Sequence, residues 1–143
     1  MPKERQLIEA QGGDSSVFDH PAAFHKPGAT QVLAAWESGY ISAMDTTQLG
    51  WAVQRTGAGR EKAGEPIDPY AGIDFPARRG ARVQKGQPIA TLYATRAELL
   101  AEPIALLKQA IHFSKTPPHE VLPLVSRIFT RESAEEYLRD AVR

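Results

Sequence analysis

The sequence predicts a single α+β domain, and three observations support this. Strand-like and helix-like segments follow one another irregularly, without the strand–helix repeat of a wound parallel sheet. The chain has 143 residues, a length that suits one domain. It contains 11 glycines and 11 prolines, which predict many turns, while its 42% of hydrophobic residues is ordinary for a globular fold.

The N-terminal part is expected to contain one short helix followed by an irregular connector. Residues 2–10 carry two apolar side chains among charges, and the glycine pair at 12 and 13 predicts the end of this helix. Residues 15–29 hold two prolines and two histidines without periodicity. They predict a surface connector.

The middle of the chain predicts strands, a helix and a long loop. Residues 31–36 and 40–44 are typical of two strands joined by a turn at 37–39. Asp45 and the two threonines after it predict the cap of a helix over residues 48–55. The stretch Gly57–Arg60 predicts the end of that helix, and a polar loop follows up to Pro66.

The second half predicts more strands and two helices. Strands are expected over 70–75 and 88–94, the last with Ile89 and Tyr93 on the face opposite Leu92, and a short strand and turn are expected over 82–87. Residues 95–98 match a capping box, which predicts a helix over 96–113 that is kinked or restarted at Pro103. Residues 121–129 predict an edge strand, and a second capping box at 133–136 predicts a terminal helix.

Composition excludes several classes of function. The 17 Lys and Arg balance the 17 Asp and Glu, so we expect neither nucleic acid nor a membrane as a partner. The chain has no cysteine, which rules out disulfides, thiolate metal sites and cysteine nucleophiles. Because it also lacks a secretion signal and a long apolar run, we expect a cytoplasmic protein.

No self-sufficient active site is predicted from the residues. His20 and His25 lie five apart, and His112 and His119 lie seven apart, so neither pair has the spacing of metal ligands on a helix. We interpret these four as surface histidines and expect no metal site. The sequence also lacks the Gly-x-Ser-x-Gly nucleophile elbow.

The stretch Gly57–Arg60 allows two interpretations. Its small residues can expose backbone N–H groups, and Arg60 can pair with an anion, which favours a phosphate site. However, it lacks the third glycine of a dinucleotide fingerprint and the Lys-Ser/Thr of a P-loop, and it follows a helix instead of preceding one. The other interpretation is a helix stop that leads into a flexible loop.

Residues 79–92 resemble the second half of a biotinyl or lipoyl carrier domain. Gly80 and Gly86 stand at the turns, and Val83, Ile89 and Leu92 at core positions. Residues 38–41 resemble the matching first half. Carrier function needs a lysine at a hairpin tip, and residues 42–47 contain none, so we expect the sandwich fold without that function.

A wider resemblance, from Arg5 to Ile128, is to the C-terminal domain of the pyrimidine-nucleoside and thymidine phosphorylases. It rests on five motifs that follow one another in the same order as in the family, at residues 8–14, 38–41, 57–60, 65–68 and 80–86. The sequence departs from the family pattern at Pro69 and Ala71. The implied fold is an α+β, barrel-sandwich-hybrid-like (hammerhead) sheet domain with interleaved helices. The implied division is a junction helix from a missing larger domain (1–14), a connector (15–29), the phosphorylase-type domain (30–128) and a terminal extension helix (129–143).

The resemblance implies a non-catalytic domain of a pentosyltransferase, a glycosyltransferase of pyrimidine metabolism. The intact enzyme is expected to cleave thymidine or uridine with phosphate, its co-substrate, to the base and (deoxy)ribose 1-phosphate, without a cofactor. The family's catalytic motifs lie in other domains and are not found here, so no catalytic or substrate-binding residue is expected and the isolated chain is predicted to be inactive. The implied partners are the N-terminal helical and phosphate-binding domains of the same enzyme, in a homodimer.

The resemblance also implies a role for the loop after the predicted central helix. In the family this loop lies toward the cleft between domains, so we expect an active-site lid here, formed by Gly57, Gly59, Arg60, Glu61, Lys62 and Gly64. The alternative role for Arg60 is to cap the carbonyls of the preceding helix. The alternative functions are a free-standing carrier-like sandwich or protein-interaction module without catalysis and, third, a small independent enzyme.

Overall fold

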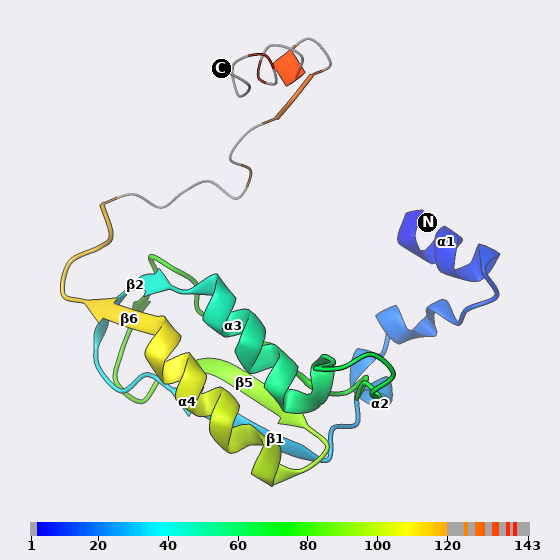
Figure 1. Cartoon of the computed structure of the whole chain (residues 1–143), viewed down its shortest axis with the longest axis horizontal. Coiled ribbons are helices and arrows are strands. Elements are labelled where there is room, and N and C mark those ends of the chain that lie inside the picture. The colour runs from blue at the N-terminus through cyan, green and yellow to red at the C-terminus, as the bar shows by residue number, and fades with distance from the viewer. Residues whose placement is uncertain are drawn as a thin grey trace.

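The body of the molecule consists of two small antiparallel sheets and a pair of helices (Figure 1). This computed structural model describes residues 3–119, 125, 128–130, 133, 134, 137 and 139. The α+β prediction is confirmed, and the narrower barrel-sandwich label stays a prediction. The edge strand predicted over 121–129 and the helix predicted after Ser133 fall largely outside the described residues.

The first sheet has the order β1-β5-β3, with strands β1 (Ala29–Ala34), β5 (Pro88–Ala94) and β3 (Gly72–Asp74). The bounds of β5 are those predicted. Its faces alternate as predicted from Ala90 to Ala94, but Ile89 departs from the prediction at a shift of register, where Leu33 pairs with Ala90 but Ala34 pairs with Pro88. This irregularity leaves Ile89 buried together with Ala90 and Leu92.

The second sheet has the order β4-β2-β6, with strands β4 (Arg82–Val83), β2 (Gly39–Met44) and β6 (Ile111–Ser114). Strand β6 corrects the prediction of a helix as far as residue 113. Ile111 pairs with Met44, and the N–H of Asp45 donates to the carbonyl of Ala110 at 2.9 Å. Hydrogen bonds to β2 therefore replace those that a longer helix would make.

The start of that predicted helix also differs. A 3-10 turn, η3 (Ala97–Leu100), precedes α4 (Ala101–Ala110), and the cap residue of η3 makes no side-chain bond. The predicted capping box is wrong, because the hydroxyl of Thr95 donates to Asp68 instead. Pro103 lies in the first turn of α4, where its missing N–H costs no helical bond, so the predicted restart of the helix near Pro103 is confirmed.

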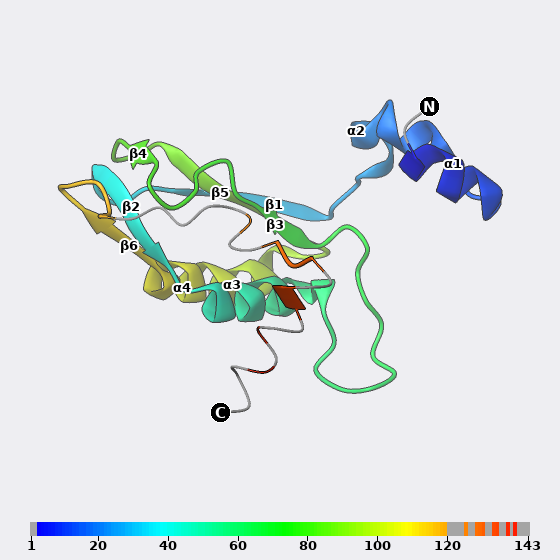
Figure 2. The same cartoon turned by 90° about the horizontal axis from the view of Figure 1, so that it is seen from above.

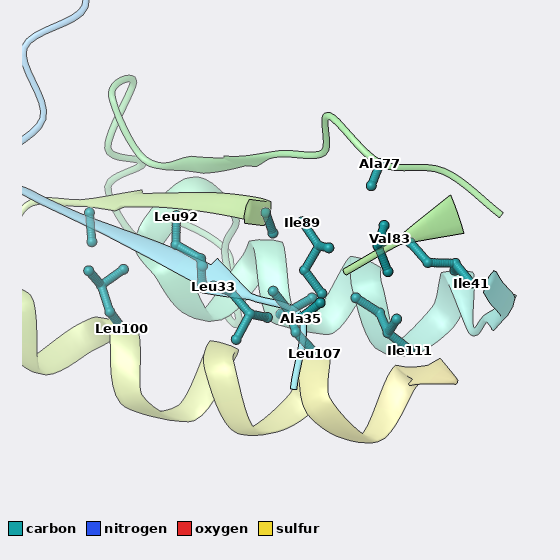
Figure 3. Close-up of a cluster of buried hydrophobic side chains, with 13 residues drawn as sticks. Leu33, Ala35, Ile41, Ala77, Val83, Ile89, Leu92, Leu100, Leu107 and Ile111 are labelled. Atoms are coloured by element: carbon teal, nitrogen blue, oxygen red, sulfur yellow. The ribbon is translucent and has the colours of Figure 1, made fainter. Parts of the chain in front are cut away.

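Helices α3 (Thr46–Val53) and α4 lie side by side against the sheets (Figures 1 and 2). The predicted cap of α3 is confirmed, since the carboxylate of Asp45 accepts hydrogen bonds from the N–H groups of Thr47 (2.9 Å) and Gln48 (3.2 Å). The core lies between the helices and the sheets (Figure 3), and its largest members are Leu33, Ile41, Val83, Ile89, Leu92, Leu100, Leu107 and Ile111.

The N-terminal part contains α1 (Lys3–Ala10), η1 (Ser15–Phe18) and α2 (Pro21–Phe24), and α1 stands apart from the body (Figure 1). The short first helix is confirmed; Gly12 follows it with φ of 77°. The connector is more regular than predicted, because η1 and α2 are helical turns and Asp14 caps η1. No helix among the described residues is long and apolar enough to cross a membrane.

Candidate functional site

The six residues predicted to form a lid lie in one loop after α3, residues 57–67, which we call the glycine loop. The π-helical turn η2 (Gln54–Ala58) leads into it. Figure 2 shows this part of the chain projecting from the body beyond the end of α3. Arg60 to Gly64 are all exposed.

Gly57 ends the helical segment, as predicted. Its φ of 101° and ψ of 0° are reached easily only by a residue without a side chain. Beside it, Thr56 is fully buried and its hydroxyl donates to the carbonyl of Val53 at 2.7 Å. The carbonyl of Gly57 accepts the N–H of Asp68 at 3.0 Å, so the two ends of the glycine loop meet at this residue.

Gly59 allows the glycine loop to pass close to the end of the helical segment. A Cβ atom at this position would lie 2.8 Å from Cγ of Gln54. The close approach lets Nε2 of Gln54 donate to the carbonyl of Arg60 at 2.5 Å. The other amide atom, Oε1 of Gln54, is buried and has no hydrogen-bond partner in the described part of the chain.

Arg55 ties the glycine loop to a second helix. Its guanidinium pairs with the carboxylate of Glu61 in the loop and, from Nε, with Oε1 of Glu102 in α4 at 3.2 Å. All three side chains are at least 36% exposed. Each such exposed ion pair contributes about 0–1 kcal/mol to the free energy of folding. The main effect of Arg55 is therefore to orient the glycine loop near Glu61, and its effect on stability is small.

An internal carboxylate holds the tip of the glycine loop. Oε2 of Glu65 accepts the N–H of Glu61 at 2.9 Å and that of Lys62 at 3.1 Å. These two amides directly follow the Gly57–Arg60 stretch, and at this turn the chain supplies its own anion to them. Gly64, at the far side of the turn, has φ of 88° and open space around it.

Asp68 anchors the far end of the glycine loop. Its carboxylate accepts the hydroxyl of Thr95, at the end of β5, and the N–H of Tyr70 at 2.9 Å. The hydrogen bond from Thr95, followed by that from Tyr70, lowers the pKa of Asp68. Nε2 of His25, from the connector, donates to the carbonyl of Tyr70 at 2.9 Å, and His25 also lowers the pKa of Asp68.

Arg60 presents a free charged group on this loop. Its side chain makes no hydrogen bond or ion pair with any described residue. The alternative role for Arg60, a cap on the carbonyls of the preceding helix, is not seen among the described residues; the contact between them runs from the Gln54 amide to the Arg60 carbonyl. The Arg60 guanidinium thus stands exposed in the glycine loop.

Sequence reasoning missed the residues that fix the loop, namely Gln54, Arg55, Asp68 and Thr95. One local signal was present for Asp68, because an Asp just before a proline often accepts a backbone N–H two residues later. The others had none. As for a metal, no group of three or more potential ligands is found among the described residues.

Comparison with known proteins adds two findings. A family model described as the pyrimidine nucleoside phosphorylase C-terminal domain matches residues 40–114, from β2 through the glycine loop to β6. A pyrimidine-nucleoside phosphorylase of Bacillus subtilis (strain 168) is 34% identical over 96 residues, which are 67% of this chain. The same match spans only 22% of that relative's length.

Proposed function

The chain belongs to the pyrimidine nucleoside phosphorylase C-terminal domain family, and from this premise we propose that it is the non-catalytic C-terminal part of such an enzyme. The intact enzyme would cleave thymidine or uridine with inorganic phosphate to the base and (deoxy)ribose 1-phosphate. Phosphate would be a co-substrate, and no cofactor would take part. The N-terminal helical and phosphate-binding domains of the same enzyme, as a homodimer, would be the partners.

The observation that carries a functional role for this chain is the construction of the glycine loop. Its ends are tied to each other and to β5 through Asp68, while Arg60 and Lys62 stand exposed beyond these anchors. A segment with fixed ends and an exposed charged tip suits a lid. We propose that it closes the cleft between domains and excludes water as the nucleoside bond breaks.

A non-catalytic role also agrees with the titratable groups of the described residues. The pKa of Arg5 is raised by its hydrogen bond to Asp19, and the pKa of Asp14 is lowered by Ser16 at a helix cap. The lowered pKa of Asp68 has a cause of the same kind. Catalytic groups are usually shifted by burial in a cleft, whereas none of these three groups is buried and each is bonded to a structural partner.

The first test is phosphorolysis by the isolated chain. Thymidine or uridine is mixed with phosphate and the chain, and the released base is separated and quantified. We expect no release above a control without protein. Release that depends on both phosphate and the chain would overturn the non-catalytic assignment. An immunoblot of source cells then tests the partners, because a band much heavier than 15.7 kDa is expected.

The lid is tested in a chimera, in which the matched segment of the Bacillus subtilis enzyme is replaced by its counterpart from this chain. In an active chimera, Arg60→Ala is expected to lower kcat about tenfold, since it removes a charge that closes over the cleft. Arg78→Ala is the matched control, because Arg78 is also exposed but lies in the turn after β3. Equal kcat values for the two variants would contradict the lid.

A further inference from the structure

A second feature lies at the other end of the molecule, where β2, β4 and β6 meet (Figure 2). An open cavity of about 590 Å³ is formed there, and we call it the basic pocket. Three of its lining residues are cations, namely Arg82, Lys85 and Lys115, and none is a carboxylate. Its volume lies in the range of small-ligand sites, about 300–1,000 Å³.

Strand register brings the lining residues together. Tyr40 in β2 pairs with Arg82 in β4 on one side and with Ser114 in β6 on the other. The neighbours Ile41 and Val83 are buried in the core. Because side chains alternate along a strand, Tyr40 and Arg82 project from the outer face of this sheet. Lys115 lies just past the end of β6 and lines the same cavity from the opposite edge of the sheet.

A fixed turn brings the third cation to the pocket. The N–H of Lys85 donates to the hydroxyl of Ser38 at 2.8 Å, and the N–H of Gly86 donates to the carbonyl of Ala35 at 2.8 Å. These bonds hold the turn after β4 against the start of β2. The backbone that carries Lys85 is therefore positioned before any ligand arrives, which reduces the ordering cost of binding.

The charge of the basic pocket is not compensated locally. The ion pairs of the described residues use Arg5 and Arg55 and none of the pocket's three cations. The whole chain is electrically neutral, with 17 basic and 17 acidic residues. Three cations gathered around one cavity in a neutral chain make a local attraction for an anion.

We propose that the basic pocket binds a small phosphate monoester that carries a planar ring, of the nucleoside monophosphate class. Arg82, Lys85 and Lys115 would hold the phosphate through charge-assisted hydrogen bonds. The ring of Tyr40, which lines the same cavity, would stack on the base. The proposal does not depend on the glycine loop or on phosphorolysis, because none of these residues belongs to that loop.

The proposal is tested by calorimetric titration of the full 143-residue chain with uridine 5′-monophosphate at low salt. Saturable one-to-one binding is expected. Uridine, which lacks the phosphate, is expected not to bind, and inorganic phosphate is expected to bind about tenfold more weakly because it cannot stack. Failure of the monophosphate to bind, or equal binding of uridine, would refute the proposal.

Charge-removing variants locate the site. Arg82→Gln and Lys115→Gln are each expected to weaken binding about three- to tenfold, and the double variant more than either. Lys108→Gln on α4 is the matched control, an exposed lysine outside the basic pocket. Far-UV circular dichroism checks that all variants stay folded. Equal weakening by the control would reveal a general charge effect and overturn the assignment.

One more titration separates a small ligand from a polymer with the same chemistry. A single-stranded oligonucleotide of ten uridines is expected to bind no more tightly, per phosphate, than the monophosphate. Tighter binding of the oligonucleotide, per phosphate, than of the monophosphate would overturn the small-ligand proposal in favour of nucleic acid.

Discussion

Two glycines seven residues apart are expected to respond in opposite ways to the same substitution. Gly50 lies inside α3 with open space where a Cβ atom would stand, whereas Gly57 ends the helical segment with φ of 101°. Alanine adds the same methyl group at both positions. The difference between Gly50→Ala and Gly57→Ala therefore isolates backbone conformation from side-chain chemistry.

The expected magnitudes follow from the geometry. Gly50→Ala should raise the free energy of unfolding by about 0.5–1 kcal/mol, because alanine loses less backbone entropy in a helix. At Gly57 no atom blocks a Cβ, since the nearest is Cβ of Asp68 at 3.7 Å. The cost is conformational, about 1–2 kcal/mol for an L residue in the left-handed region. Gly57→Ala should lower stability by about that amount.

Urea denaturation followed by tryptophan fluorescence measures both changes. Trp51 lies in α3 and Trp36 contacts Phe113 of β6 with ring centroids 4.8 Å apart, so the signal reports both the helix and the second sheet. The two midpoints should move in opposite directions at unchanged slope. If Gly57→Ala is neutral or stabilising, the left-handed conformation at the start of the glycine loop is refuted.

Three further predictions concern the core, pH and the glycine loop. Leu107→Ala, at a fully buried position, should lower the free energy of unfolding by about 2–5 kcal/mol; a loss below about 1 kcal/mol in urea melts would contradict the packing of α4. The fold lowers the pKa of Asp68, so the ionised carboxylate should stabilise the folded state at pH values above its unfolded pKa of about 3.9. This stabilisation is lost as the pH falls through the lower pKa of the folded state. Asp68→Asn should remove this part of the pH dependence of Tm between about pH 2 and 6, and an identical profile would exclude the hydrogen bond from Thr95. Gly59→Ala should displace Gln54, whose Cγ lies 2.8 Å from the new Cβ, and should speed tryptic cleavage within the glycine loop; an unchanged rate would oppose this contact.

The elements that were predicted correctly are those with local signals. The bounds of β5, the Asp45 cap of α3 and the helix end at Gly57 all depend on residues within a few positions of one another. The errors have long-range causes. Thr95 has the right spacing for a capping box, yet it bonds Asp68, which comes 27 residues earlier. Ile111 continues a helical pattern, yet it pairs with Met44.

The same division applies to the candidate site. The glycine loop itself was found from its sequence and from a resemblance, because glycines and charges are visible in the chain. Its anchors were not found, since Arg55 becomes one only when the fold brings Glu102 of α4 beside it. The role of Glu65 was equally hidden, as its carboxylate accepts the N–H groups of Glu61 and Lys62, which directly follow the stretch that had suggested a phosphate site.

The interleaved order of the strands has a consequence for biosynthesis. The central strand of the second sheet, β2, is complete at Met44, but its partner β6 ends only at Ser114. A chain emerging from the ribosome therefore carries β2 with an open edge while most of the domain is still being made. Such an edge can pair with another nascent chain. Folding must wait for β6, so this domain is expected to fold late and as one cooperative unit.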